Sequence, residues 1–106
     1  MVSQHYRTQR CERENFIKEC LNGDGKVIDS FIIDKGHKNG IERHELTENG
    51  IILIYNNNSN ILVSKLIARP QQIKRYYDNT GREPPKECEK ILELAHWYEV
   101  LGFNYI

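Results

Sequence analysis

The pattern of apolar and polar residues divides the chain into helix-like and strand-like segments. A first helix is predicted over residues 4–21, where apolar residues recur at helical spacing: Phe16, Ile17, Cys20 and Leu21. The Asn-Gly-Asp-Gly string at residues 22–25 ends this helix, because asparagine and glycine accept the positive φ of a helix stop. Residues 26–34 are rich in β-branched residues that point to alternate sides, which predicts a strand buried on both faces.

Three further strands are predicted over residues 42–47, 51–55 and 61–68. A Glu-Asn-Gly turn and an Asn-rich loop separate them, and short turns between sequential strands imply antiparallel pairing. Within the second strand, alternation places His44 and Leu46 on one face. The opposite face of this strand then carries three polar residues: Arg43, Glu45 and Thr47.

Pro70 marks the change from strand to helix. Proline suits the first turn of a helix and keeps the preceding residue out of the helical region, so a helix is predicted over residues 70–77 with Arg69 at the junction. A last helix is predicted over residues 84–101, with this apolar stripe: Cys88, Ile91, Leu92, Ala95, Tyr98 and Leu101. The sequence therefore predicts one α+β domain over residues 1–106, a four-stranded antiparallel sheet (about residues 26–68) with an N-terminal helix and two C-terminal helices packed against it.

The charge of the chain is balanced overall but unevenly distributed. Fifteen Lys and Arg residues match fifteen Asp and Glu residues, so the net charge gives no reason to expect nonspecific attraction to nucleic acid. Residues 65–75, however, contain four cations and no acid, whereas residues 83–99 contain five glutamates and two lysines. A surface with a basic side and an acidic side is therefore expected.

Neither disulfides nor a metal centre are predicted. The three cysteines are far apart and form no Cys-x-x-Cys pair, which favours a reducing cytoplasm. His44 and Glu45 match the start of a zinc-protease helix, but Glu48 occupies the place of the second histidine, so no metal or cofactor is predicted. No apolar run is long enough to cross a bilayer, and the N-terminal residues lack the apolar stretch of a signal peptide, so a cytoplasmic protein without membrane contact is expected.

His37 and His44 are the candidate acid and base, because they flank one polar loop. An imidazole, with an unperturbed pKa of roughly 6.5, can take and return a proton near neutrality. Two imidazoles can serve metal-free RNA cleavage, in which a base deprotonates the ribose 2′-hydroxyl, this oxygen attacks the adjacent phosphorus, and an acid protonates the departing 5′-oxygen. The alternative is that both histidines are solvated or hydrogen-bonded without a catalytic role.

The basic segment that follows offers candidate phosphate ligands. Arg69 could present a bidentate guanidinium where the free amides of the next helix add a partial positive potential; the alternative is a surface arginine paired with a carboxylate. Gln72, Lys74 and Arg75 could bind the RNA backbone while the tyrosines at 76 and 77 stack on bases. The alternative is an amphipathic helix with both tyrosines packed inward and the cations merely solvated.

Four segments together resemble a known family. They are residues 36–40 (GHKNG), 44–47 (HELT), 50–56 (GIILIYN) and 66–76 (LIARPQQIKRY). They resemble the phage-associated nuclease domains of the barnase, EndoU, colicin and RelE superfamily, over roughly residues 26–77. The resemblance implies a small α+β ribonuclease from a prophage, mobile element or toxin module that acts without metal on RNA or transfer RNA. The expected partners are RNA and a cognate inhibitor or host protein.

The resemblance assigns roles to individual residues. It implies His37 and His44 as acid and base in either order, Thr47 as the hydroxyl that orients phosphate, and Arg69 with Gln72 as the phosphate clamp. The first hypothesis is therefore a metal-independent endoribonuclease that leaves a 2′,3′-cyclic phosphate. In this hypothesis His44 is the base and His37 is the acid. The phosphate is surrounded by Thr47, Arg69 and Lys65, and the RNA backbone is bound by Gln72, Lys74 and Arg75.

The second hypothesis is a noncatalytic phage or mobile-element protein that uses the same sheet to bind a host protein or nucleic acid. The balanced net charge and the acidic last helix favour it, because many ribonuclease toxins are basic. Geometry separates the two hypotheses. If His37 and His44 lie far from Arg69 and from each other, one phosphate cannot contact all three side chains.

Overall fold

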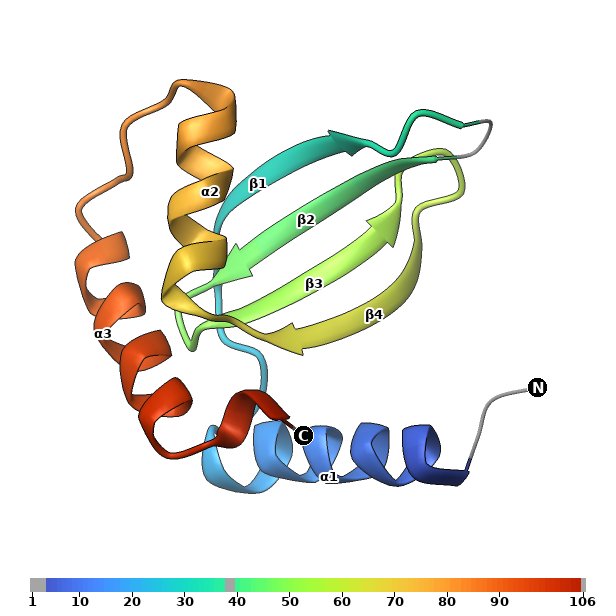
Figure 1. Ribbon diagram of the computed structural model, residues 1–106, viewed down its shortest axis with the longest axis vertical. Helices are drawn as coiled ribbons and strands as arrows, with labels where there is room; N and C mark the ends of the chain where they lie inside the picture. Colours follow the sequence, from blue (N-terminus) through green and yellow to red (C-terminus); the bar gives the residue numbers. More distant parts are fainter. Residues whose placement is uncertain (1–3, 38–39, 106) are drawn as a thin grey trace.

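The computed structural model describes residues 4–37 and 40–105 (Figure 1). Its elements, in chain order, are α1 (Gln4–Cys20), β1 (Val27–Asp34), β2 (Ile41–Thr47), β3 (Ile51–Asn56), β4 (Ile61–Ile67), α2 (Pro70–Thr80), α3 (Cys88–Val100) and a short 3-10 helix, η1 (Phe103–Tyr105). The strands form one antiparallel sheet in the order β1-β2-β3-β4, which confirms the predicted α+β fold. None of the described helices is long and apolar enough to cross a membrane.

β3 is the most deeply buried strand because helices cover both faces of the sheet along it. Ile52 and Ile54 pack with α2 and α3 on one face. Ile51 and Leu53 pack with α1 and the end of α3 on the other face. The alternation of apolar side chains in a strand buried on both faces thus supplies two separate hydrophobic clusters. Figure 1 shows that the end of the sheet where β1 and β3 finish extends beyond α2 and α3.

The prediction that β1 is buried on both faces is wrong. Phe31 is buried on the face toward α2, but Ile32 points the other way and is 58% exposed. The register also shifts between Val27 and Asp29, which brings Ile28 to the same hydrophobic cluster as Phe31. β1 is an edge strand, and α1 covers the sheet at β3 and β4 instead, so the outward face of β1 remains in solvent.

α2 begins at Pro70, as predicted, and continues three residues beyond the predicted end at residue 77. The hydroxyl of Thr80 donates to the backbone carbonyl of Tyr76 at 2.8 Å in this added turn. The buried face of the helix consists of Ile73, Tyr76 and Tyr77. The Tyr76 ring stacks on Phe31 with a centroid distance of 4.7 Å. Both tyrosines therefore pack inward, and the interpretation of them as base-stacking residues is wrong.

α3 begins at Cys88, four residues after the predicted start at residue 84. The backbone N–H of Cys88 donates to the carbonyl of Pro85 at 2.9 Å, which closes a separate turn before the helix. The two prolines therefore lie outside the first turn of α3. Cys88, Ile91 and Ala95 form the buried stripe as predicted. The prediction that Leu101 belongs to this stripe is wrong, because Leu101 follows the end of the helix and is exposed.

Candidate functional site

The residues predicted to share one phosphate lie at opposite ends of the sheet. His37 is in the loop between β1 and β2. Arg69 is the N-cap of α2, beside the turn between β2 and β3, where the backbone N–H of Ala68 donates to the carbonyl of Gly50 at 2.9 Å. β2 runs between these two ends over seven residues, a length of roughly 20 Å. One phosphate group therefore cannot contact both His37 and Arg69.

Thr47 and Lys65 are also separated from the histidine of β2. Thr47 is fully buried, and its Oγ1 accepts the backbone N–H of Ile51 at 3.1 Å, which fixes the turn between β2 and β3. Lys65 Nζ lies 3.1 Å from the Asp24 carboxylate, on the face of the sheet that α1 covers. His44 belongs to the opposite face, so these two side chains have structural partners away from it.

His44 is the centre of a hydrogen-bonded chain that runs from α2 to the open end of the sheet. Its Nδ1 lies 2.6 Å from the hydroxyl of Tyr76, and its Nε2 lies 2.9 Å from Oε1 of Glu42. The Gln72 amide donates to the same Tyr76 hydroxyl at 3.3 Å, and Lys35 Nζ lies 3.7 Å from Glu42 Oε1. The structure thus brings Gln72 and His44 into one network through a tyrosine.

The Tyr76 hydroxyl and the tautomer of His44 together set the direction of these bonds. Burial raises the pKa of Tyr76 to about 12, against a hydrogen bond from Gln72 that lowers it, and the nearby Glu42 carboxylate raises it further. The phenol is therefore neutral near pH 7 and can donate to Nδ1 of His44, which leaves Nε2–H to donate to Glu42. Both imidazole nitrogens are then engaged. The His44 side chain is 9% exposed and that of Glu42 is 26% exposed, so Glu42 is the group of this pair that a ligand can reach.

The loop between β1 and β2 places His37 near the start of β2. The His37 ring lies against Gly40, where an added Cβ would come within 3.0 Å of Cε1 and Nδ1 of the imidazole. The backbone N–H of Lys35 closes the loop by donating to the Gly40 carbonyl at 2.8 Å. Glu42 follows Gly40 by two strand positions, roughly 7 Å. Residues 38 and 39 of the GHKNG segment lie outside the described residues.

Two of the predicted RNA-binding cations are exposed on α2. Lys74 and Arg75 point away from the sheet, because the opposite side of the helix carries Ile73 and the two buried tyrosines. Gln72 is half-buried and donates to a tyrosine hydroxyl instead. The outer side of α2 therefore presents cations to solvent, without the aromatic side chains that were predicted to accompany them.

Three partners of the histidine site were not predicted from the sequence: Glu42, Tyr76 and Lys35. A signal for Glu42 was present, since residues two apart in a strand share a face and Glu42 stands two positions before His44. Tyr76 and Lys35 left no comparable signal, because their approach depends on how α2 and β1 pack beside β2.

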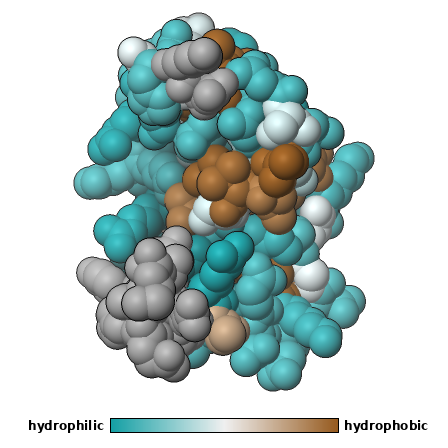
Figure 2. Space-filling model, turned by 90° about the vertical axis from the view of Figure 1, so that its right-hand side faces the viewer, coloured by the Kyte–Doolittle hydropathy of each residue, from teal (hydrophilic) through white to brown (hydrophobic). Residues whose placement is uncertain are grey.

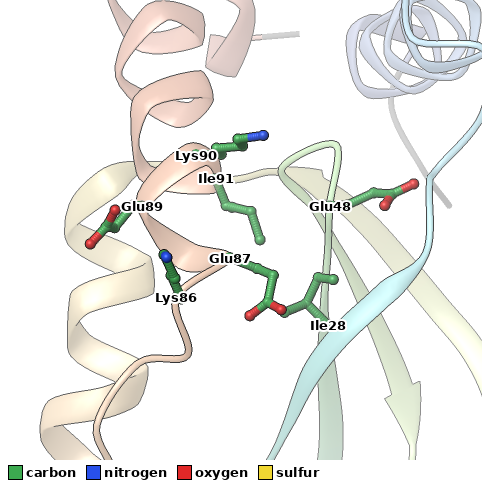
Figure 3. Close-up of a pocket in the computed structure, with 7 residues that line it drawn as sticks. All are labelled: Ile28, Glu48, Lys86, Glu87, Glu89, Lys90 and Ile91. Atoms are coloured by element: carbon green, nitrogen blue, oxygen red, sulfur yellow. The ribbon is translucent and has the colours of Figure 1, made fainter.

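A cavity of about 430 Å³ lies elsewhere, between the start of α3, β1 and the turn after β2. Figure 3 shows Ile91 of α3 and Ile28 of β1 on its apolar side, with the Glu87 carboxylate near Ile28. Its lining residues are Ile28, Glu48, Lys86, Glu87, Glu89, Lys90 and Ile91. The candidate acid–base residues do not line this cavity, so the two features are separate.

Comparison with protein-family models, with curated proteins and with solved structures gives no match for this chain. Within the described parts of the chain, three or more His, Cys, Asp or Glu side chains do not gather in a way that could hold a metal ion. The fold therefore defines the class of the protein, a small α+β domain with an open four-stranded sheet. Its function has to be argued from the site itself.

Proposed function

We propose that this chain is an endoribonuclease-like protein with Glu42 as general base and His37 as general acid. The observation that carries this proposal is the half-buried Glu42 carboxylate, held by His44 at 2.9 Å and by Lys35 at 3.7 Å. Glu42 is the second residue of β2, and the loop that contains His37 leads into this strand. β2 begins at the end of the sheet that extends beyond α2 and α3 (Figure 1). In this proposal His44 positions the Glu42 carboxylate. The proposed site does not include Arg69, Thr47 or Lys65.

The proposed reaction is a transesterification within RNA. Glu42 removes the proton of the ribose 2′-hydroxyl, and the oxygen attacks the adjacent phosphorus to form a 2′,3′-cyclic phosphate. The bond from phosphorus to the 5′-oxygen breaks, and His37 supplies the proton that this oxygen needs. The Lys35 ammonium can stabilise the charge that gathers on the phosphoryl oxygens, an effect worth roughly 3 kcal/mol for one well-placed donor.

A matched pair of variants on β2 tests the base. Glu42→Gln keeps an oxygen that can accept the hydrogen bond from His44 but removes the basic carboxylate. Glu45→Gln makes the same change on the opposite face of the strand, where Glu45 pairs with Arg43. With purified RNA in the presence of EDTA, we expect cleavage by the wild type and by Glu45→Gln, and a loss of at least about 100-fold for Glu42→Gln. Intact RNA at high wild-type concentration would contradict the proposal.

Two further variants separate this site from the one predicted by the sequence. His37→Ala should lose cleavage, because the leaving oxygen then has no acid. Arg69→Ala should retain it, because Arg69 lies at the other end of the sheet. If Arg69→Ala abolished cleavage while His37→Ala did not, the acid would have to be sought near α2 and the assignment to Glu42 and His37 would fail.

A second candidate function is noncatalytic binding of nucleic acid, as a phage or mobile-element accessory protein. The exposed Lys74 and Arg75 on the outer side of α2 favour it, together with the wide separation of the predicted catalytic residues. This function predicts salt-dependent RNA binding without cleavage. Charge reversal in a Lys74→Glu, Arg75→Glu variant should weaken that binding, measured by fluorescence anisotropy. The same changes at Lys86, in the turn before α3, and at Lys90 of α3 should not.

A further inference from the structure

β4 is an edge strand whose outer side is capped over only part of its length. The Arg13 guanidinium of α1 donates to the carbonyl of Lys65. The Asn104 amide donates to the carbonyls of Ile67 at 3.2 Å and of the residue that follows it. These caps cover the second half of the strand. Among the side chains that the structure describes, those of residues 10–37 and 40–104, corresponding caps do not reach residues 61–63.

The uncapped half of β4 also carries exposed aliphatic side chains. Ile61, Leu62 and Val63 are 64%, 40% and 51% exposed. Figure 2 views the molecule from the right-hand side of Figure 1, where β4 begins, and shows an apolar patch at the centre surrounded by polar residues. An edge strand with unpaired backbone groups and apolar side chains is a template for the addition of another strand.

The charge pattern of this segment fits a second copy of the same strand. Residues 56–64 contain no charged side chain, although 28% of the residues in the chain are charged. In a symmetric pair of antiparallel strands, residues near the two-fold axis lie close to the same residues of the second copy. A charged side chain near the axis would therefore face a like charge. The first half of β4 is uncharged and aliphatic, so it avoids this repulsion. This half also lacks the lysines with which exposed edges are commonly protected, since Lys65 lies in the capped half.

We propose that β4 pairs antiparallel with β4 of a second copy, so that the sheet continues through a symmetric dimer. The caps on Lys65 and Ile67 confine the pairing to the first half of the strand, centred near Leu62. A register shift between β3 and β4 in the same region shortens the regular ladder further. So short an interface makes a weak dimer whose population depends on concentration. This proposal is independent of the proposed ribonuclease activity.

Sedimentation velocity over a series of protein concentrations tests the proposal. For the wild type we expect a shift from monomer toward dimer as the concentration rises. Val63→Lys should raise the dissociation constant by about tenfold or more, because two ammonium groups then meet near the two-fold axis. Val100→Lys is the matched control, since Val100 is also exposed, at 60%, but lies on α3. This variant should leave the dimer unchanged. Circular dichroism confirms that both variants are folded.

Hydrogen exchange provides a second readout. The backbone amides of residues 61–63 should exchange more slowly at high than at low wild-type concentration, and Val63→Lys should abolish the difference. A monomer at all concentrations up to about 1 mM overturns the proposal and leaves this edge for a different protein. A dimer that Val100→Lys disrupts and Val63→Lys does not would also overturn it, because the interface would then lie on α3.

Discussion

The hydroxyl of Tyr76 is predicted to stabilise the fold by donating a hydrogen bond to His44. Tyr76→Phe removes only the oxygen. The ring should keep its place, because it stacks on Phe31 at 4.7 Å and packs in the cluster below α2. The variant therefore loses the 2.6 Å contact with His44 Nδ1 and the 3.3 Å contact with Gln72, while the hydrophobic contacts remain.

The expected loss follows from the burial of the groups left behind. His44 is buried, so water cannot easily take the place of the phenol as the partner of its Nδ1. A buried polar group without a hydrogen-bond partner lowers the free energy of unfolding by about 1–3 kcal/mol. Gln72 is half-buried and can turn toward solvent, so the loss of its hydrogen bond contributes no more than roughly 0.5–1.5 kcal/mol to this cost. We therefore expect Tyr76→Phe to lower the free energy of unfolding by about 2 kcal/mol. Burial raises the pKa of Tyr76 to about 12, so the phenol remains a donor throughout the neutral range.

Urea unfolding followed by far-UV circular dichroism measures this loss. The midpoint should fall while the slope stays constant, because the surface exposed on unfolding is nearly unchanged. Tyr55→Phe is the control, since Tyr55 is half-buried and its ring, not its hydroxyl, faces the Arg43 guanidinium at 4.6 Å. This control should change the free energy of unfolding by less than about 0.5 kcal/mol.

A double-mutant cycle sharpens the test. Gln72→Ala should cost roughly 0.5–1.5 kcal/mol in the wild type and much less in the Tyr76→Phe background, because the hydroxyl that accepts its hydrogen bond is already gone. Equal losses for Tyr76→Phe and Tyr55→Phe would refute the reasoning, since the buried contact with His44 would then contribute nothing measurable. Additive effects of Gln72→Ala and Tyr76→Phe would refute the coupling between them.

Two further predictions concern the turn after β2 and the loss of stability at acid pH. Gly50 has a φ of +77° and an added Cβ would lie 3.0 Å from Cε2 of Tyr98, so Gly50→Ala should cost about 2 kcal/mol in thermal unfolding; a loss below about 0.5 kcal/mol would contradict this. Burial opposes ionisation of Asp29, but hydrogen bonds from Tyr77 and Arg82 outweigh it and lower its pKa below the usual 3.8. Because the folded pKa is the lower one, this stabilisation is complete above about pH 5 and is lost as the pH falls below 3.8. Asp29→Asn should flatten the acid decline of the urea midpoint, and an unchanged decline would count against the assignment.

Local patterns in the sequence predicted the elements because each depends on neighbours in the chain. Alternation in β2 correctly put His44 on the same face as Leu46, and Pro70 correctly marked the start of α2. The same reasoning failed for β1, where Ile32 has the residue type of a buried strand but faces solvent. Whether a strand face is covered depends on where distant helices pack, and α1 covers β3 and β4 instead.

The candidate site shows the same division more sharply. Periodicity and turn residues are local features, and they were enough to predict the α+β class, the antiparallel pairing of successive strands and the face on which His44 lies. No local pattern places Arg69 at the far end of the sheet from His37, pairs Lys65 with Asp24, or joins Glu42, Tyr76 and His44 by hydrogen bonds. Strand register and helix packing set the distances between residues remote in sequence, and acid–base chemistry depends on those distances.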